Sequence, residues 1–181
     1  MAPKADILDL SRVVSAPGDG SRLDLDVVPG RLVYGGQDYG VAGHAATARL
    51  DASRTTTGYA MRLRFVADVS GPCVRCLEPA TVAVEVDSRE VEDNSGEGSE
   101  ADLRSPYVSG DELDLAAWAH DALALAMPEK FLCSDECAGL CPVCGESLND
   151  GAPDTHDHET APDPRWDKLR ELKLEGPESS S

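Results

Sequence analysis

The chain has 181 residues, a formal net charge of −18 and a hydrophobic content of 41%, although aromatic residues make up only 4%. This length fits one domain of ordinary size. A strongly negative charge repels other polyanions at long range, which argues against a protein that simply coats nucleic acid. No apolar run reaches the ~20 residues of a membrane-spanning helix, and Lys4, Asp6 and Asp9 stand where a signal peptide needs apolar residues. We therefore expect a cytoplasmic protein that does not bind membranes.

The negative charge is unevenly distributed along the chain. Glu92–Asp102 contains five acidic residues and no basic one, and Glu146–Asp163 contains six acidic residues and no basic one. We expect a solvated acidic loop over 92–104 and a solvated acidic linker over 146–163, because neither stretch has an apolar periodicity to bury. Arginines are instead concentrated between residues 49 and 75, and Arg165–Lys173 contains four cations against two acids, so the acidic chain has two locally basic stretches.

The first half of the chain has the period-two alternation of apolar and polar residues that indicates half-buried strands. This alternation runs over Ser21–Val28, over Tyr59–Val69 and again from Thr81 onward. The last two segments predict a β-hairpin. A further strand is expected near Val41–Leu50, where the alternation is interrupted by glycine.

The second half of the chain changes to helical spacing. Apolar residues recur at intervals of three and four over Asp114–Met127, and Asp114 is the expected N-cap. The segment Phe131–Leu148 is too rich in Cys, Gly and Pro for regular structure, whereas Pro164–Leu174 has the apolar stripe of a short helix. Residues 175–181 are expected to form a disordered tail.

These elements predict a single α+β domain over residues 1–174. Its sheet is expected to be mainly antiparallel, or to form a partial barrel, with one helix packed against it. An irregular segment held by zinc and a short C-terminal helix complete the predicted architecture.

The six cysteines lie in two places: Cys73-x-x-Cys76 and Cys133-x3-Cys137-x3-Cys141-x-x-Cys144. In a cytosolic protein such spacing favours metal binding over disulfides, because the compartment keeps thiols reduced. A gap of two residues lets the chain turn sharply enough for both thiolates to reach one ion at ~2.3 Å. The sequence therefore contains two metal-binding turns far apart in the chain.

Two arrangements of these cysteines are considered. Joining the two turns predicts a structural zinc site formed by Cys73, Cys76, Cys141 and Cys144. The alternative site is formed by the later cluster alone, from Cys133, Cys137, Cys141 and Cys144. Either arrangement could gain a ligand from His156 or His158.

Several kinds of chemistry are excluded by the sequence. It contains no motif for nucleotide binding, for a serine nucleophile or for a catalytic zinc ion. Cys73 and Cys76 could form a redox pair of the thioredoxin type, but that chemistry requires a helix start within a βαβ unit, which this stretch lacks. A zinc ion with four protein ligands also leaves no open position for a substrate. We therefore expect a protein that is not an enzyme and has no small-molecule substrate.

Three arginines are candidates for contact with RNA or with a protein partner. Arg62 and Arg64 share one face of the expected strand, and Arg75 would extend the row to the hairpin tip, so that three guanidinium groups could follow a phosphate track. The simpler alternative for Arg62 and Arg64 is a solvated strand face. Arg75 could instead offset the charge of a zinc centre with four thiolates, which carries about −2.

Four motifs occur together in order and spacing over Gly71–Leu172: Gly71-Pro72-Cys73-Val74-Arg75-Cys76-Leu77, Leu113-Asp114-Leu115 with Ala126-Met127-Pro128, Cys137-Ala138-Gly139-Leu140-Cys141-Pro142-Val143-Cys144-Gly145, and Asp163-Pro164-Arg165-Trp166. In these motifs the chain resembles the YceD family of large ribosomal RNA accumulation proteins, in its Gram-positive or actinobacterial form with a cysteine cluster. Many such members carry a further Cys-x-Cys where this chain has Thr155–His158.

The resemblance implies a function. It implies a bacterial, non-catalytic factor for biogenesis of the large ribosomal subunit and accumulation of its RNA. The implied partners are a ribosomal protein of the large subunit, precursor ribosomal RNA, or both. The alternative is a zinc-dependent protein-interaction adaptor that does not contact RNA.

Overall fold

The computed structural model describes residues 6–94, 103–149 and 158. The chain divides into two compact units, Met1–Gly139 and Leu140–Ser181. All helices and strands of the described residues lie in the first unit. The expectation of one domain over residues 1–174 stays a prediction.

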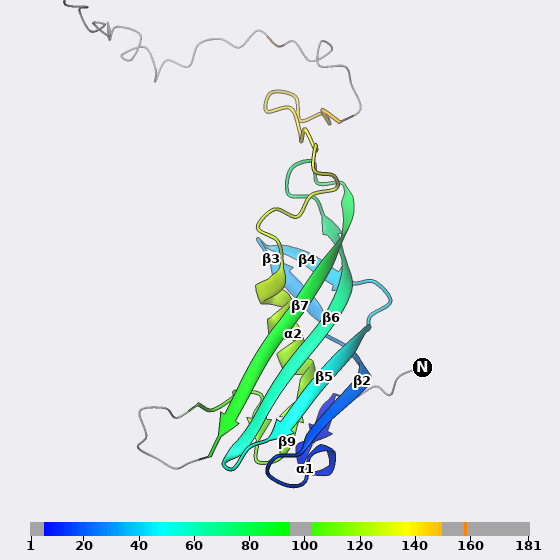
Figure 1. The fold of residues 1–181 in the computed structure, drawn as a ribbon. Coiled ribbons are helices and arrows are strands. Elements are labelled where there is room, and N and C mark those ends of the chain that lie inside the picture. Colours follow the sequence, from blue (N-terminus) through cyan, green and yellow to red (C-terminus); the bar gives the residue numbers. More distant parts are fainter. Residues whose placement is uncertain (1–5, 95–102, 150–157, 159–181) are drawn as a thin grey trace, which may run out of the picture. The chain divides into compact units, whose positions relative to one another are not determined.

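The main element of the first unit is a six-stranded antiparallel sheet, in which the strands follow the order β2-β5-β6-β4-β3 and β7 pairs with β6. Its strands are β2 (Gly20–Val27), β3 (Arg31–Tyr34), β4 (Gln37–Val41), β5 (Ala46–Arg54), β6 (Gly58–Pro72) and β7 (Pro79–Asp93). The long strand β6 is central, because β5 and β4 share one of its edges while β7 pairs along the whole of the other (Figure 1). Among the described residues the strands do not close into a barrel.

A smaller three-stranded sheet has the order β1-β9-β8. Its strands are β1 (Ile7–Asp9), β8 (Val108–Ser109) and β9 (Glu112–Asp114), and the one-turn helix α1 (Leu10–Val13) follows β1. The amide of Leu10 donates to the carbonyl oxygen of Asp111 over 2.8 Å, so the N-terminal segment is fastened to the turn between β8 and β9.

Strand β6 has the alternation that the sequence predicts. Its odd-numbered residues from Tyr59 to Val69 are buried, whereas Arg62 and Arg64 point to the opposite face. Because side chains alternate between the two faces of a sheet, one face of β6 is continuously apolar and packs into the core.

Helix α2 (Leu115–Ala126) covers the apolar face of the sheet (Figure 1). Its N-cap is Asp114, whose side chain accepts a hydrogen bond from the amide of Ala117 over 2.9 Å, which satisfies one of the free amides at the helix start. Trp118 is fully buried, and its indole N–H donates to the hydroxyl of Ser88 on β7 over 2.9 Å. The predicted helix over Asp114–Met127 is thus confirmed.

The other expected elements have mixed outcomes. The strand predicted over Ser21–Val28 is confirmed as β2, and the hairpin is confirmed as β6 and β7. The strand predicted near Val41–Leu50 is confirmed only in its second half, because β4 ends at Val41 and β5 begins at Ala46. Gly43 and His44 have φ angles of 72° and 65°, so the chain turns where a strand was expected. The hairpin of β3 and β4 was not expected at all.

The acidic loop begins later than the sequence predicts. Strand β7 continues to Asp93, and Glu92 is only 4% exposed. Its carboxylate accepts a hydrogen bond from the amide of Ser105 over 2.8 Å, so Glu92 belongs to the folded sheet and not to a solvated loop. Most of both acidic stretches, the helix expected over 164–174 and the tail over 175–181 lie outside the described residues.

No helix within the described part of the chain is both long and apolar enough to span a membrane.

Candidate metal centre

The tip of the β6–β7 hairpin is a tight turn that begins at Cys73. The amide of Cys73 donates to the carbonyl oxygen of Glu78 over 2.8 Å, and the amide of Leu77 donates to the carbonyl oxygen of Cys73 over 3.0 Å. Leu77 has a φ angle of 63°, which is unusual for a residue with a side chain and closes the turn. The amide of Arg75 lies 3.5 Å from the Cys73 sulfur. Cys73 and Cys76 are both buried inside this turn.

The segment after α2 is attached to this turn through Phe131. The carbonyl oxygen of Phe131 accepts a hydrogen bond from the amide of Val74 over 2.9 Å. The Phe131 ring is fully buried and meets the ring of Tyr39 edge to face, with the two centroids 4.8 Å apart. The hydroxyl of Tyr39 donates in turn to the carbonyl oxygen of Pro72 over 3.2 Å. These contacts fix the chain two residues before Cys133.

Four cysteines are thereby brought together: Cys73, Cys76, Cys133 and Cys137, whose sulfurs all lie within 4.8 Å of one another. The Cys73 and Cys137 sulfurs are 3.7 Å apart, and those of Cys76 and Cys133 are 3.5 Å apart. Four sulfurs at ~2.3 Å from a zinc ion in tetrahedral geometry would be separated by about 3.8 Å. The two measured separations are close to this value, so the four cysteines could hold a metal ion.

The electrostatics of the cluster favour one thiolate and resist further ones. Burial raises the pKa of the Cys73 thiol, but amide N–H groups of Cys76 and Arg75 directed at the sulfur lower this pKa to about 6 overall. Contacts with the sulfurs of Cys76 and Cys137 raise the pKa of Cys133 to about 12. Because neighbouring thiolates repel one another, a divalent cation bound between them would stabilise the fully deprotonated cluster.

Arg75 lies beside this cluster. One of its guanidinium nitrogens donates to the carbonyl oxygen of Cys137 over 2.7 Å, so its positive charge is held near the sulfurs. Gly139 lies two residues after Cys137 and has a φ angle of 84°. A Cβ at this position would lie 3.3 Å from the carbonyl oxygen of Arg75, so the two backbones are close together. The tip of the hairpin and the segment after α2 are thus in direct contact.

The remaining cysteines form a second group in the unit Leu140–Ser181. The donor atoms of Cys141, Cys144 and His158 lie within 4.8 Å of one another. Amide N–H groups of Cys144 and Val143 directed at the Cys141 sulfur lower its pKa to about 7, although burial opposes this shift.

The structure therefore groups the cysteines differently from both arrangements considered for the sequence. It joins Cys73 and Cys76 to Cys133 and Cys137, and it joins Cys141 and Cys144 to His158. His156 lies outside the described residues. The signal that sequence reasoning missed is Phe131, a large apolar residue two positions before Cys133, which anchors that cysteine below the hairpin tip.

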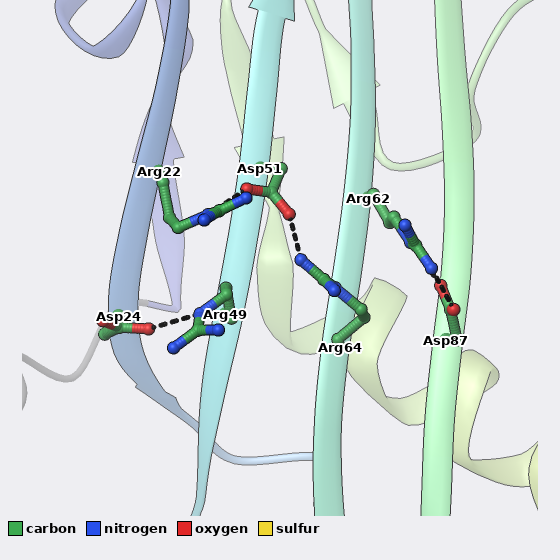
Figure 2. Close-up of polar contacts among 7 residues, drawn as sticks. All are labelled: Arg22, Asp24, Arg49, Asp51, Arg62, Arg64 and Asp87. Atoms are coloured by element: carbon green, nitrogen blue, oxygen red, sulfur yellow. Dashed lines mark hydrogen bonds and ion pairs between the residues drawn. The ribbon is translucent and has the colours of Figure 1, made fainter.

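The candidate arginines all have partners within the protein. Figure 2 shows Arg62 bound to Asp87 through two nitrogens and Arg64 bound to Asp51, diagonally across neighbouring strands on the outer face of the sheet. Asp51 also accepts from Arg22. The pKa of Asp87 is lowered, first by its hydrogen bond with Arg62, as expected for a carboxylate that stays charged in this pair.

This face also contains an ion pair of Arg49 with Asp24, so the four arginines in Figure 2 are matched by aspartates. Arg62 and Arg64 do share a face, as the alternation predicts, whereas Arg75 is directed to the carbonyl of Cys137. A phosphate group that approached Arg62 or Arg64 would compete with a carboxylate already in place. Their role as a contact for RNA or a partner stays a prediction.

The fold and the cluster together define a class: a small α+β protein whose central hairpin carries a cysteine cluster suited to a structural metal ion. The chain belongs to the family described as Large ribosomal RNA subunit accumulation protein YceD, which it matches over residues 61–173. The match begins in β6 and includes every cysteine of the chain.

Three mycobacterial proteins are similar to this chain, one from Mycobacterium bovis and two from strains of Mycobacterium tuberculosis, and all three are described as uncharacterized. Each is 35% identical over 118 residues, which cover 64% of this chain. The chain spans 55% of the length of these relatives. No solved structure matches the chain significantly.

Proposed function

We propose that this protein is a non-catalytic factor for biogenesis of the large ribosomal subunit and that it acts in the cytoplasm on accumulation of the large-subunit RNA. The observation that carries the proposal is the family match over residues 61–173, which spans most of β6, all of β7, α2 and both cysteine groups. The partners are a large-subunit ribosomal protein, precursor ribosomal RNA, or both.

The metal has a structural role in this proposal. Cys73, Cys76, Cys133 and Cys137 hold one zinc ion, and the four sulfurs complete its coordination. Such an ion stabilises the union of the hairpin tip with the segment after α2, because structural zinc sites in small peptides contribute about 10–16 kcal/mol at neutral pH. With four protein ligands the ion has no position for a substrate.

The contact with the partner is proposed to involve the outer face and the tip of the hairpin, through Arg62, Arg64 and Arg75. These arginines are already bound to Asp87, Asp51 and the Cys137 carbonyl. A phosphate group can therefore bind them only if it displaces some of these hydrogen bonds. Exposed ion pairs contribute only ~0–1 kcal/mol each, so the exchange is energetically feasible for Arg62, whereas the pair of Arg64 with Asp51 is part-buried and costs more to open.

A second candidate function is a zinc-dependent adaptor that binds a ribosomal protein and does not contact RNA. The observation that favours it is the same pairing on the outer face, which leaves arginine charge neutralised by aspartates in a chain with a net charge of −18. Binding to precursor RNA separates the two functions. Its affinity should fall steeply with salt if phosphates are contacted, because counterions are then released.

The experiment that tests the proposed function is deletion of the gene in the bacterium that encodes it, followed by complementation. The deletion should lower the ratio of large- to small-subunit ribosomal RNA, and the wild-type gene should restore it. An unchanged ratio in the deletion strain would overturn the proposal. The double variant Arg62→Glu/Arg64→Glu and the single variant Arg75→Glu should fail to restore the ratio, whereas the control Arg12→Glu, at a highly exposed position of helix α1, should succeed.

A further inference from the structure

The turn that begins at Cys141 repeats the backbone geometry of the turn that begins at Cys73. In both turns the amide of the first cysteine donates to the carbonyl oxygen of the residue five positions later over 2.8 Å. The amide four positions later donates back to the first cysteine's carbonyl oxygen, over 3.0 Å at Leu77 and 2.9 Å at Gly145. Both of these residues have positive φ angles, 63° and 76°.

The environment of the leading sulfur is also repeated. The amide two positions after the cysteine lies 3.5 Å from the sulfur in both turns, donated by Arg75 in one and by Val143 in the other. The residues that flank each turn are paired in antiparallel fashion in the same register, Pro72 with Pro79 and Leu140 with Ser147. The two turns therefore have the same backbone structure, and each places two cysteine sulfurs side by side.

The two turns receive different additional donors, each from its own compact unit. Cys133 and Cys137 complete the first group, and His158 completes the second. His158 is fourteen positions after Cys144 in the sequence, yet its ring nitrogen lies within 4.8 Å of both sulfurs. An imidazole and two thiolates are ligands that zinc prefers in proteins.

We propose that Cys141, Cys144 and His158 bind a second metal ion of the zinc class, separate from the ion of the first group. This inference rests on the geometry of the two turns and is independent of any role in ribosome assembly. The described residues supply three donors, so a fourth position is taken by water or by a nearby carboxylate. Glu146 is one such carboxylate, with an oxygen 3.9 Å from the Cys144 sulfur.

The second ion should be held less tightly than the first. Its site has two thiolates in place of four, and only Cys141 among its three donors is buried, whereas three of the four cysteines of the first group are buried. A metal ion with three protein ligands and an open position also exchanges its fourth ligand more readily than one in a closed site. The second centre is thus an exchangeable one.

The test is elemental analysis of the full-length protein, purified without oxygen, together with its variants. The wild-type protein should contain about two zinc ions per chain. The variants Cys144→Ser and Cys76→Ser should each lose about one ion, from different centres. The variant His158→Asn should behave as Cys144→Ser does, and the control His44→Asn, at an exposed turn in the first unit, should retain the wild-type content.

Competition with a zinc-binding dye adds a second readout. The wild-type protein should release its zinc in two phases, and Cys144→Ser should lack the faster phase while keeping the thermal unfolding of the wild type. The proposal is overturned if the wild type and Cys144→Ser have equal zinc contents and one release phase. It is also overturned if Cys76→Ser and Cys144→Ser each remove all the zinc, since both turns would then share one ion.

Discussion

The backbone amide of Val74, at the hairpin tip, donates a hydrogen bond of 2.9 Å to the carbonyl oxygen of Phe131, fifty-seven residues later in the chain. This bond aligns the segment that carries Cys133 and Cys137 with the turn that carries Cys73 and Cys76. Which four cysteines meet at the hairpin tip therefore depends on this long-range backbone contact as well as on the spacing within each cysteine pair.

The first prediction concerns this ligand set. The variant Cys133→Ser should lose the zinc of the first centre and lower the thermal stability of the protein, because one sulfur of the closed tetrahedron is removed. Zinc content and thermal unfolding of the purified variant are the measurements. Cys141→Ser is the matched control, and it should leave the first centre loaded. If Cys133→Ser instead keeps the zinc content of the wild type, the result would favour the ligands predicted from the sequence, which are Cys73, Cys76, Cys141 and Cys144.

A second prediction concerns the close approach of Tyr39 to Gly71. A Cβ on Gly71 would lie 2.1 Å from the Tyr39 ring, which is buried and meets Phe131 edge to face. Gly71→Ala should destabilise the fold by about 1–3 kcal/mol, because overpacking displaces the ring. Urea unfolding measures this effect. In the neighbouring strand β4, Gly40 has open space around it, so Gly40→Ala should change the free energy of unfolding by less than ~0.5 kcal/mol. Equal stability of the two variants would contradict the close contact.

The third prediction concerns Glu92, whose carboxylate accepts the amide of Ser105 in a buried position. Glu92→Ala should lower the free energy of unfolding by about 1–3 kcal/mol, because the buried amide loses its acceptor. Glu92→Gln should recover much of this loss, since its side-chain carbonyl oxygen can accept the same bond. The control Glu85→Ala lies at an exposed position of the same strand and should have little effect. If Glu92→Ala leaves the free energy of unfolding unchanged, then the buried hydrogen bond of Glu92 does not stabilise the fold, and the residue behaves as part of a solvated acidic loop.

The fourth prediction concerns stability at high pH. Burial and a hydrogen bond of 2.5 Å to Asp111 raise the pKa of Tyr59 from 10.0 to about 12. Because the folded state holds this proton more tightly than the unfolded state, the contribution to stability is complete below pH 10 and is lost as the pH rises towards about 12. Burial similarly raises the pKa of Tyr107 to about 12.

The free energy of unfolding, measured across this pH range, should therefore decrease in the wild-type protein. Tyr59→Phe should weaken the decrease, and Tyr107→Phe should do so independently because the two hydroxyls bind different carboxylates, Asp111 and Asp121. If Tyr59→Phe retains the full decrease of the wild type, then Tyr59 does not carry the linkage.

Much of the fold could be predicted from the sequence because its signals are local. The alternation on β6 and β7 depends on the period of a strand, and the start of α2 depends on Asp114 and the spacing of the apolar residues that follow it. The two cysteine turns are local as well, since a gap of two residues is enough to place their sulfurs side by side. By contrast, β3 and β4 carry weak alternation, and the pairing of β4 with β6 relies on contacts distant in the sequence.

The sequence by itself determined that the chain has two Cys-x-x-Cys turns and that Arg62 and Arg64 share the outward face of one strand. The tertiary structure decided which donors join each turn and which carboxylate neutralises each arginine. Spacing limits only the residues a few positions apart, whereas Cys73 meets Cys137 because the Phe131 ring is buried against Tyr39 and its carbonyl is bonded to Val74. Arg64 likewise meets Asp51 because β5 and β6 pair in one register. Such pairings follow from the packing of distant segments, which no local pattern encodes.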